Sequence, residues 1–551
     1  MSGLPNTRTL HLTPLSPVHL GTDEDYTPTQ YVIEDDALFE FDHRALTALP
    51  ATDRAVLMRI LEGRPQPRML KQVQAYFFER RDRLIPEAVN VVKVCAGVAT
   101  LYRARVGRAA NVESGGREVH NRLEIERAAY DPADRRLYVP GSGLKGAIRT
   151  ALLDRRNAGA PLPPDLRGDR HASRKLQERL FGYSMRELHK DPMRLVQVGD
   201  CRWYGPDDLN SAEILFAVNR AKRPAARHGR ETASRAERGG LYQLLECLAP
   251  FRVRAFRGTL TVIDVGAVAG HPKLPQRRFG FADIAAACNA FYRPLFDDEL
   301  RRLHERGLLD AEWRRTVTGL LDDPALRRRF ETGQAFLVRV GRHSGAESVT
   351  LNGVRSIRIK QGQGRPPAWE PAARTWWLAA AEEHDQAHLI PFGWVLAELG
   401  DDLPPWERAE ALVSRDHAEQ AAWLRQVRER QRRLGERLRQ AREAEAARAR
   451  AEAERRRREQ ERAERLARMH PEERLIEQVR EQLECDRRAG RKEAGGELNQ
   501  KRLELLEAAL SWDDPELRRR AAELLAETAR WLPWAKKRRQ EIREKLARLT
   551  P

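Results

Sequence analysis

A proline-free stretch rich in arginine and glutamate limits the folds open to this chain of 551 residues. No proline occurs between Trp406 and His470, and residues 421–470 contain 17 arginines and 9 glutamates, with Gly435 as the only glycine. Alanine, glutamate and arginine favour helices, and many Glu/Arg pairs stand three or four residues apart. The pattern predicts one helix of about 60 residues, about 90 Å long. Its apolar positions form a poor heptad seam, which favours a solvated or loosely paired helix over a committed coiled coil.

Regions of different composition flank this stretch. Before residue 404, strand and helix patterns mix without the regular alternation of a doubly wound sheet, which favours an α+β fold. Pro471 ends the long helix, and the apolar spacing beyond it predicts three or four short amphipathic helices in a small bundle, a candidate protein-docking module. We expect four parts: a first α+β domain at 1–210, a second at 211–403, the long helix at 404–470 and the bundle at 471–551.

The charge balance favours a polyanionic partner. Lys and Arg number 99 against 81 for Asp and Glu, which gives a net charge of +18 and a pI near 10.0. The five cysteines form no C-x-x-C pair, so neither a zinc ribbon nor a disulfide framework is readable. The first residues lack the apolar core of a signal peptide, and no run of about 18 apolar residues occurs. We therefore expect a cytoplasmic protein that has no membrane partner.

Shorter patterns in the first region predict individual elements. The segments YVIE and ALFEF flank Asp35-Asp36, which suits a two-residue hairpin turn. Helical patterns cover about 51–62 and 67–82. Alternating apolar residues predict long strands at Val91–Arg105 and Val119–Ala129.

The segment LYVPGSGLKGAIRTALL (Leu137–Leu153) reads as strand, glycine turn and helix. A helix start offers unpaired N–H groups and a partial positive charge, which suits an anion. Lys145 and Arg149 lie four residues apart and add full charges on one helical side. A phosphate group is the expected ligand of this turn.

Two other interpretations of the glycines stay open. Gly141, Gly143 and Gly146 satisfy G-x-G-x-x-G, but a dinucleotide site also needs a strand ending in an acidic residue about 20 positions later. That region is a Pro/Gly/Arg loop that holds Asp165 and Asp169. Alternatively, the glycines serve only close packing of the helix on a strand.

Two further segments carry cations that could meet a polyanion. Phe336–Gly345 reads FLVRVGRHSG, again a strand that leads into a glycine loop. Residues 219–240 hold six arginines and a lysine against two glutamates, with no large apolar residue. This basic loop is either a solvated loop or an arm that orders on a nucleic-acid backbone. The long helix likewise either presents a basic face to RNA or acts as a solvated spacer.

Four stretches together resemble a known family. They are LSPVHLGTDEDYTPTQYVIEDD near the start, VPGSGLKGAIRTALL, FLVRVGRHSG and LIPFGWVLAEL (Leu389–Leu399), in the expected order over roughly residues 8–400. They resemble the repeat-associated mysterious proteins (RAMPs) of type III CRISPR effector complexes, most closely the fifth, backbone-capping subunit of the type III-A Csm complex.

This resemblance implies two ferredoxin-like (RRM-related) RAMP domains that bind guide RNA near its 3′ end and support antiviral defence. It implies as partners the neighbouring backbone RAMP subunit, the small helical subunit of the complex and trimming nucleases, and it implies no catalytic centre, metal or cofactor. An RNP-type aromatic pattern is absent from the sequence, so contacts should go mostly to RNA backbone and shape. The residues that match the family's RNA-facing loops are His19, Gly21, Gly141, Ser142, Gly143, Lys145, Gly146, Arg149, Gly341, Arg342, His343, Ser344 and Gly345.

A metal-independent endoribonuclease that processes CRISPR RNA is the enzymatic alternative. Such chemistry uses a general base beside a 2′-hydroxyl, with cations that stabilise the developing charge. His19, His120 and His343 are the candidates. The acidic residues Asp23-Glu24-Asp25 could hold a divalent ion, although a solvated turn is the simpler interpretation.

Overall fold

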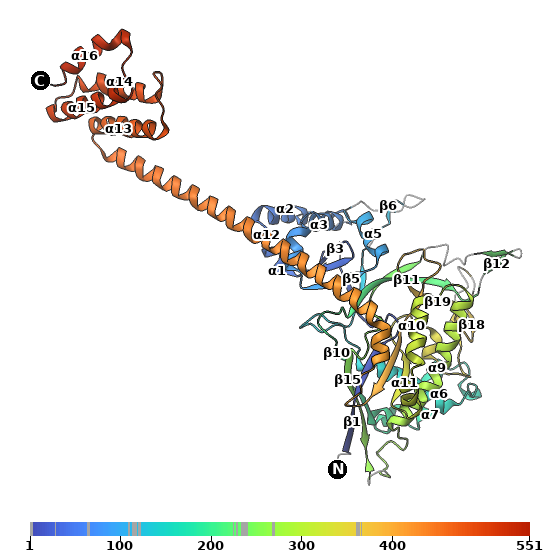
Figure 1. Cartoon of the computed structure of the whole chain (residues 1–551). Helices are drawn as coiled ribbons and strands as arrows, with labels where there is room; N and C mark the ends of the chain where they lie inside the picture. The colour runs from blue at the N-terminus through green and yellow to red at the C-terminus, as the bar shows by residue number, and fades with distance from the viewer. Residues whose placement is uncertain are drawn as a thin grey trace. The chain divides into compact units, whose positions relative to one another are not determined.

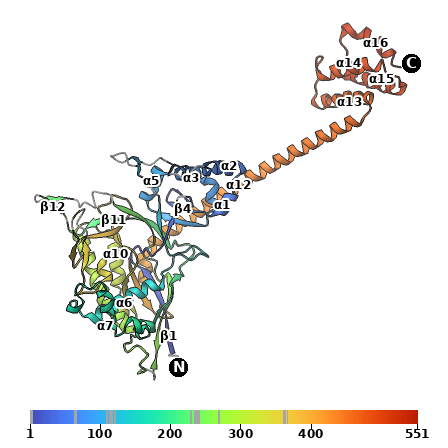
Figure 2. The ribbon, with the colours of Figure 1, turned by 180° about the vertical axis from the view of Figure 1, so that it is seen from behind.

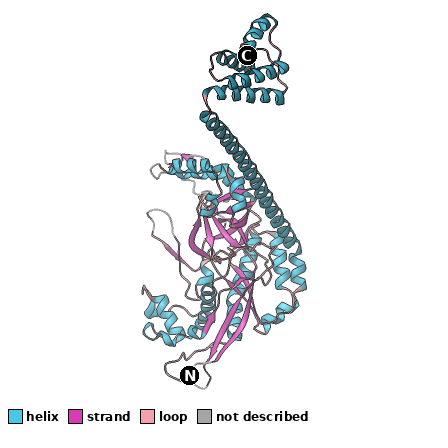
Figure 3. Cartoon of the chain, turned by 90° about the vertical axis from the view of Figure 1, so that its left-hand side faces the viewer, coloured by secondary structure: helices cyan, strands magenta, loops and turns pink. Residues whose placement is uncertain are grey.

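The computed structural model describes residues 4–27, 29–62, 67–107, 111–112, 118–119, 123–223, 225–227, 230–232, 241–266, 270–359, 364 and 366–550. The chain divides into two compact units, Met1–Glu436 and Arg437–Pro551. The first unit mixes helices and strands, as predicted for an α+β fold, whereas the described part of the second is helical (Figure 3). None of the described helices is long and apolar enough to cross a membrane.

The first sheet of the N-terminal unit is antiparallel throughout its described pairs. Its order is β10–β15–β1–β21–β16, with β9 also paired to β15. Strands β1 and β15 run side by side from Leu4↔Asp264 to Leu12↔Phe256 (Figure 1). The bounds are β1 Leu4–Pro14, β9 Val196–Val198, β10 Arg202–Trp203, β15 Phe256–Asp264, β16 Ala335–Arg339 and β21 Trp394–Leu399.

The second sheet has the order β2–β8–β14–β11–β5–β4–β3, with β19 paired to β11 and β20 to β19. The predicted hairpin at Asp35-Asp36 is confirmed, because Glu34 pairs with Ala37 and Asp35 has the positive φ (53°) of such turns. The bounds are β2 Gly21–Tyr26, β3 Tyr31–Glu34, β4 Ala37–Glu40, β5 Asn90–Val94, β8 Ile125–Ala128, β11 Ala212–Ala221, β14 Tyr242–Leu248, β19 Thr375–Ala380 and β20 Ile390–Pro391.

Both sheets draw strands from both sides of residue 210, where the sequence suggested a domain boundary. The first sheet joins β1 to β21, and the second joins β5 to β11. The segments 1–210 and 211–403 therefore both contribute strands to each sheet. Three short pairs lie outside the two sheets: β6 (Asn111–Val112) with β7 (Glu118–Val119), β12 (Ala225–Arg227) with β13 (Arg230–Thr232), and β17 (Ile357–Ile359) with β18 (Ala368–Glu370).

Helices α6 and α9 pack on each other (Figure 1) and contact the first sheet at β9 and β16, and α7 lies against α6 (Figure 2). Pro294 lies inside α9 without ending the helix, and Phe296 and Trp394 meet edge to face in the core, 5.0 Å apart. The helices of this unit that precede the long helix are α1 His43–Thr47, α2 Ala51–Leu61, α3 Pro67–Glu79, α4 Arg81–Leu84, α5 Ala96–Arg105, α6 Gly141–Asn157, α7 Ala172–Phe181, α9 Phe281–Glu305, α10 Ala311–Leu321 and α11 Pro324–Glu331.

Two predicted strands are wrong in extent. The segment Val91–Arg105 is strand only to Val94 and then forms α5, because Val98, Ala99 and Tyr102 share one buried helical face. Apolar residues spaced this closely fit both the two-residue period of a strand and the 3.6-residue period of a helix. Within the predicted strand Val119–Ala129, strand β8 covers only Ile125–Ala128. Residues 120–122 lie outside the described part of the chain.

The predicted long helix is present as α12 (Glu407–Arg468), but its first part is not solvated. Val413, Trp423, Leu424 and Val427 are buried against the N-terminal unit. Arg430 adds ion pairs of 2.7 Å with both Glu34 and Asp35. The sequence did not predict this packing, because these four apolar residues stand among many charged ones and form no clear apolar face.

The predicted helices of the C-terminal unit are also confirmed. Beyond residue 470 they enclose a core of their own, which includes Val479, Leu505 and Leu525. Gly490 ends the first of them in the left-handed conformation (φ 66°). The bounds are α13 Pro471–Ala489, α14 Glu497–Ala509, α15 Pro515–Trp531 and α16 Arg539–Ala547.

Candidate nucleic-acid interface

Three segments that lie more than a hundred residues apart in the sequence meet around Leu20: the opening loop, the start of α6 and the loop after β16. A Cβ on Gly143 would lie 3.3 Å from the Leu20 side chain, and one on Gly341 would lie 3.6 Å from it. The backbone N–H of Arg342 donates to the carbonyl of His19 over 2.8 Å. The structure therefore joins the opening loop, the start of α6 and the loop after β16 into one glycine-rich surface.

The fourth stretch of the predicted pattern holds these loops in place. The N–H of Gly393 donates to the carbonyl of Pro17 over 2.9 Å, and a Cβ on Gly393 would stand 2.5 Å from the carbonyl of Val340. Gly393 also has φ +92°, and Gly341 has φ +84° with His19 only 2.3 Å from a built Cβ. Any side chain at either position would collide with backbone, so both must be glycine.

The start of α6 differs from the predicted glycine turn. The helix begins at Gly141 rather than Leu144, so all three glycines lie within it. A Cβ on Gly141 would lie 2.2 Å from the carbonyl of Val198, and the Gly141 N–H donates to the Asp200 carboxylate over 2.8 Å. The packing interpretation holds for Gly141, and a protein carboxylate already occupies part of the predicted anion site.

In the first turns of α6, Ser142 and Gly146 are exposed. Nothing lies within 4 Å of a Cβ built on Gly146, so packing does not require glycine there. Lys145 is half-buried, and burial lowers its pKa although Asp191 acts in the opposite direction. Arg149 is engaged inside the protein: it donates to Asp191 (2.9 Å), to the Tyr183 hydroxyl (2.8 Å) and to the Gln177 amide oxygen (3.2 Å).

The two described histidines of the loops face the protein. His19 is 1% exposed, and its Nδ1 donates to the carbonyl of Glu246 over 2.7 Å. His343 stacks on Trp377 with ring centroids 4.6 Å apart, and its Nε2 shares a 2.8 Å hydrogen bond with Gln243. Burial, aided by the Arg342 charge, lowers the pKa of His343 to about 3. His120 lies outside the described residues.

The remaining loop residues divide between the interior and the surface. Arg342 is exposed and forms an ion pair with Glu126, whose pKa is raised mainly by burial. Ser344 is buried, whereas Gly21 and Gly345 are exposed. The surface thus offers backbone, a serine hydroxyl, Arg342 and part of Lys145, a set suited to close approach of a phosphate backbone rather than to acid–base chemistry.

A buried polar network lies beneath the surface, and no local pattern in the sequence predicts it. The Tyr26 hydroxyl donates to Glu246 over 2.7 Å, and the Ala128 N–H donates to its second oxygen over 3.0 Å. Burial raises the pKa of Glu246 to about 7. Arg127 makes two bonds of 2.9 Å to Glu40. The pairing of β2, β8 and β14 brings Tyr26, Ala128 and Glu246 together, while Glu40 comes from β4.

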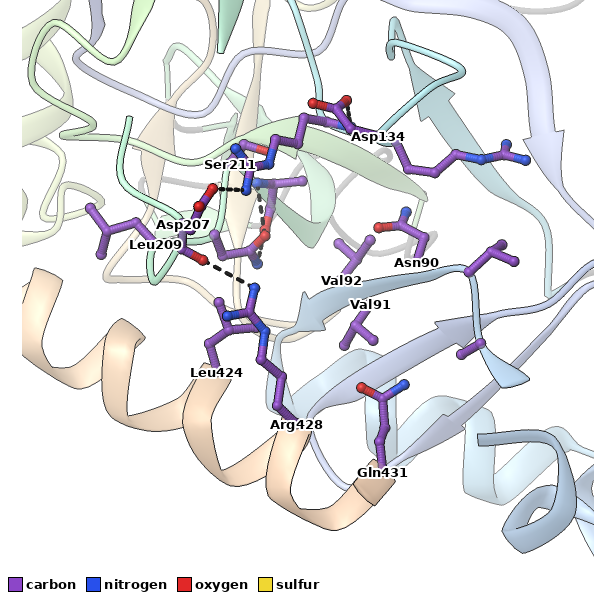
Figure 4. Close-up of a pocket in the computed structure, with 16 residues that line it drawn as sticks. Asn90, Val91, Val92, Asp134, Asp207, Leu209, Ser211, Leu424, Arg428 and Gln431 are labelled. Atoms are coloured by element: carbon purple, nitrogen blue, oxygen red, sulfur yellow. Dashed lines mark hydrogen bonds and ion pairs between the residues drawn. The ribbon is translucent and has the colours of Figure 1, made fainter. Parts of the chain in front are cut away.

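A separate cavity of about 230 Å³ lies beside the first part of α12 (Figure 4). Arg136 pairs with Asp207 over 2.6 Å, and Arg428 donates to the Asp207 carbonyl over 3.0 Å. None of the loop residues lines this cavity. Its polar groups already serve one another, so it is a poor candidate for a ligand site.

Other predicted features are placed as follows. Asp23-Glu24-Asp25 lies on β2, and the described residues contain no group of three or more His, Cys, Asp or Glu side chains placed to hold a metal ion. The basic loop 219–240 begins inside β11, where the Nε of the buried Arg220 donates to the Asp385 carbonyl over 3.0 Å. Lys222 pairs with Glu347 over 2.6 Å. Residues 224, 228–229 and 233–240 lie outside the described part.

Comparison with known proteins finds a match to one family model. Residues 11–262 match the family model of the RAMP superfamily. We call these residues the RAMP region. The RAMP region contains the opening loop and the start of α6, while the loop Gly341–Gly345 that completes the surface lies beyond it. No curated protein matches the chain.

Two solved structures are similar over most of their own length. One is a chain of a Csm–crRNA–target RNA ternary complex of a type III-A CRISPR-Cas system, with 17% identity over 72% of this chain and 100% of that chain and a TM-score of 0.42. The other is Csm5 of T. onnurineus, with 18% identity over 70% and 99% and a TM-score of 0.43. Both TM-scores are below 0.5, and neither likeness by itself establishes the fold.

Proposed function

We propose that this chain is a non-catalytic RNA-binding subunit of a type III-A CRISPR effector complex. In this role it caps the backbone at the 3′ end of the guide RNA and supports guide maturation, complex assembly and antiviral defence. The observation that carries the proposal is that two glycine-rich loops and the glycine-rich start of α6 converge on one surface. The opening loop and the start of α6 lie in the RAMP region. The same proposal includes two ferredoxin-like domains within this chain. Its proposed partners are the neighbouring backbone RAMP subunit, the small helical subunit and trimming nucleases.

The chemistry of the surface supports contact with RNA backbone. Glycines let a phosphate approach the main chain closely, and Arg342 supplies a charge that can exchange Glu126 for phosphate. The exposed Ser142 adds a hydroxyl donor near the start of α6. No exposed aromatic lies among the described residues of the three loops, which argues for recognition of shape rather than of bases.

The positions of the histidines support a non-catalytic role over the endoribonuclease alternative. A general base works best with a pKa near the operating pH and must reach the substrate hydroxyl. His19 is buried and bonded to a carbonyl, and His343 has a pKa of about 3 and stacks on Trp377. Neither imidazole is arranged to take a proton from RNA at neutral pH.

The first experiment is purification of the tagged chain from cells that hold its native neighbours. We expect a ladder of related subunits with one chain per complex and a short, uniform guide RNA. The variant Arg342→Gln should weaken retention of that RNA. The matched control is Arg315→Gln, because Arg315 is also an exposed arginine paired with a glutamate, Glu312. A chain that emerges alone, with heterogeneous RNA, would contradict the proposal.

A second experiment separates the subunit from the nuclease. Purified chain is incubated with repeat RNA in the presence of a chelator, and cleavage and binding are both measured. We expect binding without cleavage. Cleavage that His19→Ala or His343→Ala abolishes while binding persists would establish the endoribonuclease instead.

A further inference from the structure

A run of four arginines in the long helix, Arg455–Arg458, is paired within the helix. In residues 452–461, four arginines stand among four glutamates, and each arginine pairs with a glutamate four residues away. The nitrogen–oxygen distances run from 2.5 Å for Arg458–Glu454 to 3.6 Å for Arg455–Glu459. This part of α12 therefore presents nearly balanced charge, which favours the solvated spacer over an RNA-binding face.

The last segment of the C-terminal unit is different. Residues 536–548 hold seven lysines and arginines against two glutamates, and one of these, Glu541, already pairs with Lys545 over 2.9 Å. The side chains of Lys536, Lys537, Arg538 and Arg543 are exposed and make no ion pair or hydrogen bond with any residue in the described part of the chain. We call residues 536–548 the terminal basic segment.

The terminal basic segment is anchored to the bundle core, so its charges keep a defined arrangement. Ile542 is 3% exposed and Leu549 is 1% exposed, both within the apolar core of the bundle. The Arg539 Nε donates to the carbonyl of Trp534 over 2.9 Å, and the Arg502 guanidinium lies 3.7 Å from the centre of the Trp534 ring. Holding Lys536, Lys537, Arg538 and Arg543 in one short segment without a paired carboxylate for any of them costs free energy, which an anionic partner would recover.

We propose that the terminal basic segment binds the phosphodiester backbone of a nucleic acid, at a site distinct from the glycine loops. Dense, regularly spaced phosphates match a short run of unpaired cations, and affinity then comes from release of counterions. An anionic membrane fits less well. Peripheral helices insert apolar side chains beside their cations, but no large apolar residue of the described bundle is exposed. This inference extends beyond the RAMP region and does not depend on the proposed function.

The test uses the full chain and two variants of equal charge change. One is Lys536→Gln, Lys537→Gln, Arg538→Gln and Arg543→Gln combined; the control replaces Arg455, Arg456, Arg457 and Arg458 by Gln. Binding of a labelled uridine homopolymer and of a labelled DNA duplex is measured across a salt series. We expect the first variant to bind at least about tenfold more weakly, with the salt slope for the single strand lowered by up to about 3. The control should lose much less.

Each outcome decides something. Equal losses in both variants would mean that overall charge, not this segment, drives binding, and would overturn the proposal. No loss in the first variant, with its unfolding temperature unchanged, would overturn it as well. The homopolymer and duplex show which form supplies the phosphates. Stronger binding to vesicles of anionic phospholipid than to either nucleic acid would replace it with a membrane site. The four substitutions should also weaken nucleic-acid binding when they are made in the Ser142→Glu variant, which shows that this site is separate from the glycine-rich surface.

Discussion

Ser142→Glu separates RNA binding from stability at the candidate interface. Ser142 is exposed in the first turn of α6, and that turn contains no acidic residue. A carboxylate at this position interacts favourably with the helix dipole and unfavourably with a phosphate that approaches the same turn. The substitution should therefore stabilise the protein while it weakens RNA binding, a combination that misfolding cannot produce.

The two effects differ in size. A glutamate near an exposed helix start contributes about 0.3–1 kcal/mol, and we expect the lower end because Asp200 already accepts the Gly141 N–H. Against RNA, two unit charges about 4 Å apart repel by about 1 kcal/mol in water and by more where water is excluded. We therefore expect the dissociation constant for guide RNA to rise by about five- to thirty-fold.

The assay pairs thermal unfolding with equilibrium RNA binding at fixed salt, because phosphate contacts are salt-dependent. Ser142→Gln is the matched control, since it adds the same bulk without the charge. Unchanged RNA affinity in Ser142→Glu, with the expected rise in stability, would refute the reasoning: RNA would then not approach the start of α6. A fall in both properties would mean that Ser142 has a structural role instead.

Three further predictions concern the framework of the interface and of the N-terminal unit. Gly141→Ala should destabilise the protein by about 1–3 kcal/mol because its Cβ would meet the Val198 carbonyl, whereas Gly146→Ala should stabilise it by about 0.5–1 kcal/mol, both measured by urea denaturation. His343 has a pKa of about 3 in the fold against 6.5 as a free side chain, so the unfolded chain binds more protons between these values and stability falls with falling pH. His343→Gln should lose less stability than the wild type between pH 6 and 4, by up to about 1.4 kcal/mol per pH unit; parallel profiles would contradict the burial argument. Trp423→Ala should cost about 3–5 kcal/mol in unfolding of the N-terminal unit, and a negligible cost would mean that α12 does not complete its core.

Local sequence signals predicted the elements whose causes are local. The hairpin at Asp35-Asp36 follows from two alternating strands around a turn that tolerates positive φ. The extent of α12 follows from helix propensity and the lack of proline between Trp406 and His470. The prediction of a single strand over Val91–Arg105 failed because the apolar residues suit a strand up to Val94 and a buried helical face from Val98 to Tyr102.

Three of the segments grouped by the family resemblance come together in the structure, but the surroundings of their residues were not predictable. The resemblance placed His19, Ser142, Arg149 and His343 in one group. The structure sorts them by partners that lie far away in the chain: Glu246 for His19, Asp191 for Arg149, and Gln243 and Trp377 for His343. Ser142 alone of these four faces solvent. Such partners depend on which strands pair, and strand pairing over long separations leaves no mark on a single sequence.

The arginine-rich helix holds fewer unpaired arginines than its composition suggests. Arg455–Arg458 form an unbroken run of four arginines, yet each of them pairs with a glutamate four residues away. Lys536, Lys537 and Arg538 are fewer but lack such partners. Counterion release depends on unpaired charge rather than on composition, so a polyanion should prefer the short segment. Where a chain is basic overall, the pairing of its cations decides where a polyanion binds.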